Sequence, residues 1–280
     1  MLFRNKGVDP ETVSQLETDY SRQTLRKVLL VSGLTVLIVT FAAFSLTVNG
    51  RDIGFFETCS YIINHILGTE YEYRSVEWYD DFMIWNIYLP RVCLGVFLGV
   101  GLSICGVAMQ SVMNNPLADS YTTGISDGAC FGAVMSSISS SMGVVTNAFV
   151  CGLVPAFILI ALSSMMKMSP ATSILVGVAL SYIFSGLESA IMVATDADTL
   201  KEAYLWQIGS LGDIMSWDQC YIPISVTVLG SAAIWMCSNK LNLLSLGDDS
   251  AKSLGLDVRM FKAIVMIIVS VIVASLVSFV

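Results

Sequence analysis

Seven long apolar runs dominate this sequence, and they limit the solvent in which the chain can fold. They lie at residues 28–48, 92–113, 128–145, 148–166, 171–195, 220–237 and 263–280. An α-helix needs roughly 20 apolar residues to cross a membrane, where every backbone N–H and C=O must be paired within the protein. Barrel strands would alternate apolar and polar residues, and these runs do not. The sequence therefore predicts an all-α, polytopic helical membrane protein in which each of these seven runs is a transmembrane helix.

The composition is typical of a membrane protein and excludes several other classes. Charged residues make up 13% of the chain and apolar residues 55%, whereas a soluble domain carries about 25% charged residues. The formal net charge of −8 argues against a nucleic-acid partner. The cysteines show no C-x-x-C spacing and lie mostly in apolar runs, where cysteine acts as a small hydrophobe. Neither a metal site nor a cofactor is predicted.

The distribution of basic residues predicts the topology. Residues 1–27 are polar and mixed in charge, so they are predicted to form a cytoplasmic tail rather than a signal peptide, with 28–280 as the transmembrane domain. Orientation follows the Lys and Arg residues near helix ends. With the N-terminus in the cytoplasm, ten of the fourteen basic residues fall on the inner side. The acidic, aromatic segment 50–88 is then an outer loop, and 238–262 lies inside.

Few ionisable groups lie in the predicted spans, which bears on the energy source. Glu188 lies within the fifth run, and Asp127 stands at the start of the third. A gradient-driven carrier usually has ionisable groups in its spans, and no proton relay is visible. The sequence has no P-loop motif for ATP and no nucleophile–base pair that suggests an enzyme. Uphill transport would therefore need energy from another subunit, with a gradient-driven carrier and a structural or sensory membrane protein as alternatives.

Residues 114–126, NNPLADSYTTGIS, form a polar interruption between two apolar runs. Asn115–Pro116 is predicted to end the preceding helix, because the residue before proline avoids the α region and proline has no N–H. The hydroxyls of Thr122, Thr123 or Ser126 can cap the helix that follows. The interruption is therefore predicted to be a tight turn on the cytoplasmic side.

The segment 241–258 predicts a short helix between two spans. Gly247 is predicted to interrupt the helical structure, an amphipathic stretch of mixed charge follows, and Gly255 is predicted to end that stretch. On the cytoplasmic side, such a helix is either a docking element for a partner protein or an interfacial helix that rests on lipid headgroups.

The stretch that starts at Leu89 contains a specific pattern, formed by Leu89, Pro90, Arg91, Gly106, Gln110, Asn115, Pro116, Leu117, Ala118, Gly124, Ile125, Gly128 and Ala129. In these residues the sequence resembles the FecCD family, the permeases of type II ABC importers for ferric siderophores, haem and vitamin B12. The sequence departs from the family pattern at Ser120, where the family usually has Pro, and at Thr123, where Leu is common. Three later segments also resemble the family: LVGVAL (175–180), LWQIGSLGDIMSWD (205–218) and LNLLSLGDDSAKSLGLDV (241–258).

This resemblance implies a transport subunit that is not itself an enzyme, with a helix that couples it to a separate ATPase. The coupling positions would be Leu246, Gly247, Asp248, Asp249, Ala251, Lys252, Leu254 and Gly255. The family turn would be Asn115, Pro116, Leu117, Ala118 and Gly124. Arg51 and Arg74 would contact an extracytoplasmic substrate-binding protein. A second permease copy, as a homodimer or heterodimer in the cytoplasmic membrane, would complete the pathway.

Substrate and chain length are the last expectations from the resemblance. A ferric siderophore or related metal chelate is the favoured cargo, and vitamin B12 and haem are the alternatives. The family continues with a G-P-[IV]-x-F-[VI]-G-[LF]-x-x-P-H segment and further helices, which do not occur here. The expectation is a chain truncated at its C-terminus.

Overall fold

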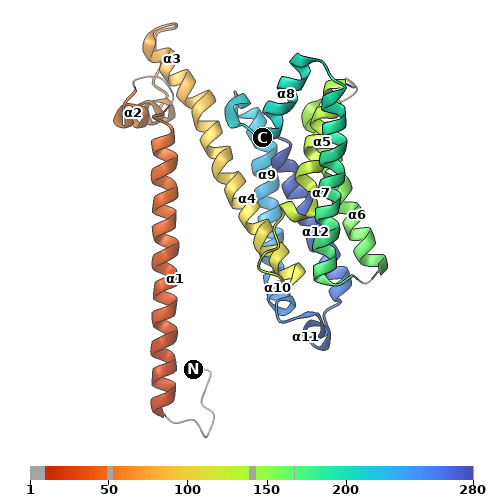
Figure 1. The fold of residues 1–280 in the computed structure, drawn as a ribbon. Helices are drawn as coiled ribbons and strands as arrows, with labels where there is room; N and C mark the ends of the chain where they lie inside the picture. Colours follow the sequence, from red (N-terminus) through yellow and green to blue (C-terminus); the bar gives the residue numbers. More distant parts are fainter. Residues whose placement is uncertain (1–9, 49–52, 139–142, 167, 280) are drawn as a thin grey trace. The chain divides into compact units, whose positions relative to one another are not determined.

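Helices make up most of the computed structural model, which describes residues 10–48, 53–138, 143–166 and 168–279 (Figure 1). These described ranges contain no β-strand, which confirms the predicted all-α class. The chain divides into two compact units, Met1–Glu77 and Trp78–Val280.

The first unit contains two helices, α1 (Pro10–Ser45) and α2 (Phe55–Ile66). In α1, the stretch Glu17–Ser45 is long and apolar enough to cross a membrane. The described part of the predicted tail, residues 10–27, belongs to the same continuous helix. Within the apolar stretch, the hydroxyls of Thr35 and Thr40 donate to the carbonyls of Val31 and Val36. These bonds satisfy the hydroxyls inside the helix, as a lipid environment requires.

The second unit is a helical bundle, and its elements follow in chain order. They are α3 (Val76–Met83), which starts in the first unit, η1 (Ile84–Tyr88), α4 (Leu89–Met113), η2 (Tyr121–Thr123), α5 (Ile125–Ile138), α6 (Val144–Met166), α7 (Pro170–Val193), α8 (Ala197–Ile208), η3 (Leu211–Asp213), α9 (Asp218–Met236), α10 (Ser238–Leu244), α11 (Asp248–Ser253) and α12 (Val258–Val277). Figure 1 shows α10 and α11 at one end of this unit and α8 at the other. We refer to them as the α11 end and the α8 end.

Six helical stretches in the described residues are long and apolar enough to span a membrane, and they coincide with six of the seven predicted runs. The remaining run, 128–145, is covered in its first part by α5. The 14 residues of α5 rise about 21 Å, which is less than the roughly 30 Å of a hydrocarbon core. Residues 139–142 lie outside the described residues.

The segment 50–88, predicted as a loop, is mostly helical where the structure describes it. It contains α2, α3 and η1, and the helical stretch that includes α4 runs without a break from Val76 to Met113. The aromatic residues Trp78, Tyr79, Trp85 and Tyr88 therefore lie on a helix.

A π-helical turn, η1, joins α3 to α4, and Pro90 explains it. Proline has no N–H and its ring crowds the carbonyl four residues earlier, so a regular α-turn cannot continue through it. The Leu89 N–H bonds the carbonyl of Ile84, five residues back. In this wider turn, the Trp85 carbonyl receives no bond from Pro90, and the indole Nε1 of Trp217 donates to it at 3.0 Å.

The core of the second unit forms around α12, which contacts α4, α5, α6 and α9. In its most apolar window 56% of the residues are buried, against 22–28% for the other spans of this unit. Val265, Val269, Ile272, Val273 and Leu276 are at most 1% exposed. Their helical spacing places them on one face, so α12 is buried by packing rather than by lipid.

Small residues bring α5, α6 and α7 close together. A side chain at Gly128 or Gly132 would overlap backbone oxygens of α6, those of Cys151 and Asn147 respectively. Gly177 of α7 lies against the Thr122 carbonyl of the η2 turn. In a membrane, where apolar surface gives little driving force, such close backbone approach is a main source of helix association.

Replacing Gly177 with alanine tests this packing. The added methyl group would overlap the Thr122 carbonyl oxygen, and we expect a loss of roughly 1–3 kcal/mol of stability from overpacking. The measurement is the midpoint of thermal unfolding in detergent. Gly99→Ala is the matched control, because no atom lies within 4 Å of the position its methyl would occupy. Equal midpoints for the two variants would contradict the close approach of α7 and η2.

Candidate functional site

The α11 end contains a six-residue helix that is bounded on both sides by glycines in left-handed backbone conformations. Gly247 has φ of 104° and Gly255 has φ of 87°, values that residues with a Cβ rarely adopt. Asp248 and Asp249 lie in the first turn and Lys252 in the last, which complements the helix dipole. The structure thus forms a helix at the predicted position, with the predicted ends.

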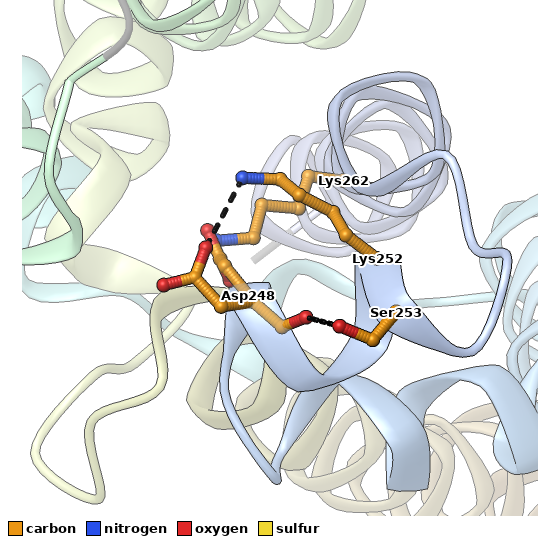
Figure 2. Close-up of polar contacts among 5 residues, drawn as sticks. Asp248, Lys252, Ser253 and Lys262 are labelled. Atoms are coloured by element: carbon orange, nitrogen blue, oxygen red, sulfur yellow. Dashed lines mark hydrogen bonds and ion pairs between the residues drawn. The ribbon is translucent and has the colours of Figure 1, made fainter.

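One side of α11 is attached to the bundle. Ala251 is fully buried, and the Lys262 ammonium of α12 lies 2.8 Å from Oδ1 and 2.9 Å from Oδ2 of Asp248 (Figure 2). The backbone N–H of Leu256 also bonds the Ala251 carbonyl at 3.1 Å. These contacts hold the helix against the first turn of α12.

The other side of α11 is free of the described chain. The Asp249 side chain is fully exposed. Its Oδ1 lies 3.6 Å from the ammonium of the exposed Lys252, which is its one ion pair in the described chain. Leu254 is 63% exposed and Leu246 is 66% exposed. These two leucines flank α11 on either side in the chain, so exposed apolar side chains accompany the exposed carboxylate at this end of the bundle.

The turn between α4 and α5 is stabilised by its own polar side chains. Asn114 ends α4 in the left-handed conformation, with φ of 49°. The Asn115 side-chain oxygen accepts from the Leu117 N–H at 2.9 Å, and Gln110 Nε2 donates to the Pro116 carbonyl at 3.1 Å. The positions Gln110 and Asn115–Pro116, predicted from separate motifs, therefore belong to one hydrogen-bonded turn.

The sequence suggested Thr122 or Thr123 as a cap for α5, but in the structure neither hydroxyl caps this helix. Their hydroxyls donate to the carbonyls of Asp119 and Ser120, each at 2.6 Å, and so bond within the turn. Ser120 is fully buried, and its N–H donates to Asp119 Oδ1 at 2.5 Å. This bond satisfies the N–H that proline, the residue of the family pattern, would lack.

This turn lies at the same end of the bundle as α11. A methyl at Gly247 would come within 3.9 Å of Asn114 Nδ2, and α10 packs against α4. Ala118 is buried, whereas Leu117 is 85% exposed. Burial and the nearby Asp119 carboxylate raise the pKa of Tyr121, so its phenol stays protonated at neutral pH. The turn therefore presents an exposed leucine beside an uncharged tyrosine.

Arg91 joins two segments at the opposite part of α4. Its Nε donates to the Ile214 carbonyl at 2.8 Å and its Nη2 to the Gly212 carbonyl at 2.5 Å. The Cys220 thiol lies 3.6 Å from the carbonyl of Pro90. Positions 89–91 and 205–218, which matched the family separately, thus contact each other. A lone arginine after proline at a helix entrance was the only sequence signal for this structural role.

The other residues singled out from the sequence do not belong to α11. Arg51 lies outside the described residues. Arg74 sits in a left-handed turn with its guanidinium over the Tyr73 ring, 5.4 Å from the centroid. Glu188 is 2% exposed, and its Oε1 has no hydrogen-bond partner in the described chain. The described residues contain no group of three or more His, Cys, Asp or Glu side chains that can hold a metal ion.

The Asp248–Lys262 pair gives a measurable prediction. The two side chains are 34% and 19% exposed, so we expect a double-mutant cycle of Asp248→Asn and Lys262→Gln to give a coupling energy of about 1 kcal/mol. Denaturant unfolding of the four proteins supplies the values. The control cycle is Asp249→Asn with Lys252→Gln, a pair that is exposed and 3.6 Å apart, for which a value near zero is expected. Equal coupling in both cycles would contradict the tether.

Comparison with known proteins places this architecture in a family. The model of the FecCD transport family matches residues 34–280. A Helicobacter pylori protein named as a probable iron chelatin transport system permease is 31% identical over 238 residues, which cover 85% of this chain and 70% of that protein. A cobalamin import system permease, BtuC of Halobacterium salinarum, is 32% identical over 70% of this chain and 54% of its own length.

A solved structure has the same arrangement of helices. It is an inward-facing conformation of a transporter assigned to the metal-chelate type of ABC transporters, and it covers 89% of this chain and 75% of its own. The TM-score is 0.72 at 25% sequence identity. Taken with the match over residues 34–280, this shows that the chain belongs to the FecCD transport family, the permeases of ABC importers of the metal-chelate, siderophore, haem and vitamin B12 type.

Proposed function

We propose that this chain is the membrane-spanning subunit of an importer for a ferric siderophore or related metal chelate, energised by a separate ATPase. The observation that carries the proposal is α11, a short helix that exposes Asp249 and is flanked in the chain by the exposed Leu246 and Leu254. Because the sequence has no P-loop, the energy of ATP must enter through a contact with another protein, and this exposed surface is suited to that contact.

The attachment of α11 to α12 supports a mechanical role. Lys262 lies in the first turns of α12 and holds Asp248, so α11 and α12 would move together. Since α12 packs against α4, α5, α6 and α9, a displacement of α11 would be passed to several spans at once. Close-packed helices respond to such a push by shifting as units rather than by deforming. This is the motion that alternating access requires.

The proposal also includes an orientation in the membrane, a substrate-binding protein and a second permease copy. The N-terminus and the α11 end would face the cytoplasm, because basic residues favour that side of a membrane. The segment 50–88, with Arg51 and Arg74, would face outward and contact a substrate-binding protein. A second permease copy, identical or related, would form the other wall of the pathway.

An iron chelate is the favoured cargo, because one relative is named for iron chelatin transport. Vitamin B12 is the alternative, since another relative is named for cobalamin import, and haem is a further one. A gradient-driven carrier is less favoured, because Glu188 is the one acidic residue within the spans 144–166, 170–193 and 258–277.

The test is capture of an ATPase from membranes of cells that contain the tagged chain. Asp249→Ala with Leu254→Ala should strongly reduce capture of a P-loop ATPase, because it removes the exposed carboxylate and leucine while leaving the Asp248–Lys262 pair intact. Quantitative mass spectrometry of the eluate measures the loss, which we expect to be about tenfold or more, a change of about 1.4 kcal/mol in binding.

The matched control is Glu72→Ala with Val76→Ala, an exposed acid and an exposed aliphatic residue far from α11 in the sequence. It should retain the ATPase at the wild-type level. If wild-type protein captures no ATPase, the proposal fails and the gradient-driven carrier becomes the better explanation.

Reporter fusions test the proposed topology. Green fluorescent protein fused after residue 245, between α10 and α11, should fluoresce, and alkaline phosphatase fused there should be inactive, because that enzyme requires the oxidising space outside the cytoplasm. Fusions after residue 209, between α8 and η3, should give the opposite result. The reversed pattern would place α11 outside and exclude its role in ATPase docking.

A further inference from the structure

A cavity of about 350 Å³ lies at the α11 end, beneath the candidate coupling helix. Its walls come from α4, α6, α7, α11 and α12. The apolar part includes Val112, Ile160 and Met266, and the hydroxyl groups come from Ser163, Ser164 and Ser173. Small-molecule sites have volumes of roughly 300–1,000 Å³ and this mixture of apolar surface with a few polar groups.

Positive charge exceeds negative charge around this cavity. Four charged side chains line it, namely Asp248, Lys252, Arg259 and Lys262. Asp248 and Lys262 neutralise each other through the ion pair at 2.8 Å. Lys252 and Arg259 therefore remain as surplus cations, and the exposed Asp249, 3.6 Å from Lys252, is screened by solvent.

Arg259 has unused hydrogen-bonding capacity. Its Nε and Nη2 both reach the hydroxyl of Ser164, at 3.1 and 2.9 Å. Among the described residues no carboxylate lies within ion-pair distance of this guanidinium. A guanidinium has five N–H donors in a planar fork that matches the oxygens of a carboxylate or phosphate, and here that fork is held at the cavity wall by one neutral hydroxyl.

We propose that this cavity binds a phosphate group, carried by an anionic phospholipid headgroup or by a soluble phosphate compound. Arg259 would bind two phosphate oxygens, Lys252 would add a point charge, and the Ser164 hydroxyl, which accepts from Arg259 and keeps its own hydrogen, would donate a further hydrogen bond. Basic pockets between transmembrane helices are known sites for phospholipid headgroups. The apolar residues beside the cations suit the glycerol and upper acyl chain of a lipid, while the cations alone suffice for a soluble phosphate.

Ligand-dependent stabilisation of the delipidated chain in a neutral detergent tests the site. The probes are short-chain phosphatidylglycerol, phosphatidylcholine of equal chain length and inorganic phosphate, each titrated at fixed ionic strength. The unfolding midpoint should rise with phosphatidylglycerol or with inorganic phosphate, because a ligand that binds only the folded state stabilises it. Arg259→Gln should weaken the apparent affinity about tenfold, equivalent to about 1.4 kcal/mol, and Arg259→Lys should weaken it less.

The control variant is Lys240→Gln, which removes an exposed cation of α10 that lies near Phe261 and does not line the cavity. It should bind as the wild type does. A response to phosphatidylglycerol alone identifies a lipid headgroup, and a response to inorganic phosphate identifies a soluble ligand. The proposal is overturned if neither probe stabilises the wild type, or if Arg259→Gln responds like Lys240→Gln. Should Arg259→Gln not purify as a single species, the same comparison is made with Arg259→Lys.

Discussion

The burial of α12 among four neighbouring helices is the constraint on which the second unit depends. Lipid solvates apolar side chains as well as a protein core does, so helices in a membrane associate through close packing and hydrogen bonds. α12 packs against α4, α5, α6 and α9, and residues 272–276 of its last turns are buried on every side. Because α11 is tied to the first turns of this same helix through Lys262, the exposed side of α11 is connected mechanically to the centre of the bundle.

Polar groups in this bundle are paired mainly with backbone carbonyls that local geometry has left free. Pro90 removes an N–H, and Trp217 supplies the missing donor to the carbonyl of Trp85. Arg91 donates to the carbonyls of Gly212 and Ile214 at η3. Gln110 donates to the carbonyl of Pro116. The bonds of Trp217 and Arg91 join the start of the α4 stretch to the segment 205–218, which is more than 120 residues later in the chain.

The apolar runs were sufficient to predict the class and six of the spans, because lipid imposes length and polarity on a helix. They could not predict the helices within 50–88, since that acidic and aromatic segment has no long apolar run to signal them. The short α11 was predictable from its two bounding glycines and the charges between them. The attachment of α11 to α12 was not predictable, because the turn at Gly255 lies between Asp248 and Lys262 and the sequence does not show that it brings them together.

The two left-handed glycines that bound α11 also fix its length. Within a six-residue helix each residue turns the chain by about 100°, so one inserted or deleted residue between Gly247 and Gly255 would rotate the exposed face away from a partner. If α11 docks on a partner as proposed, substitutions on that face would change only the strength of the contact, whereas a change in length would remove the contact and also strain the tether to Lys262. Homologous chains would therefore be free to vary the side chains of this helix while keeping the number of its residues, and pairs of permease and partner could diverge in specificity without losing the mechanical link.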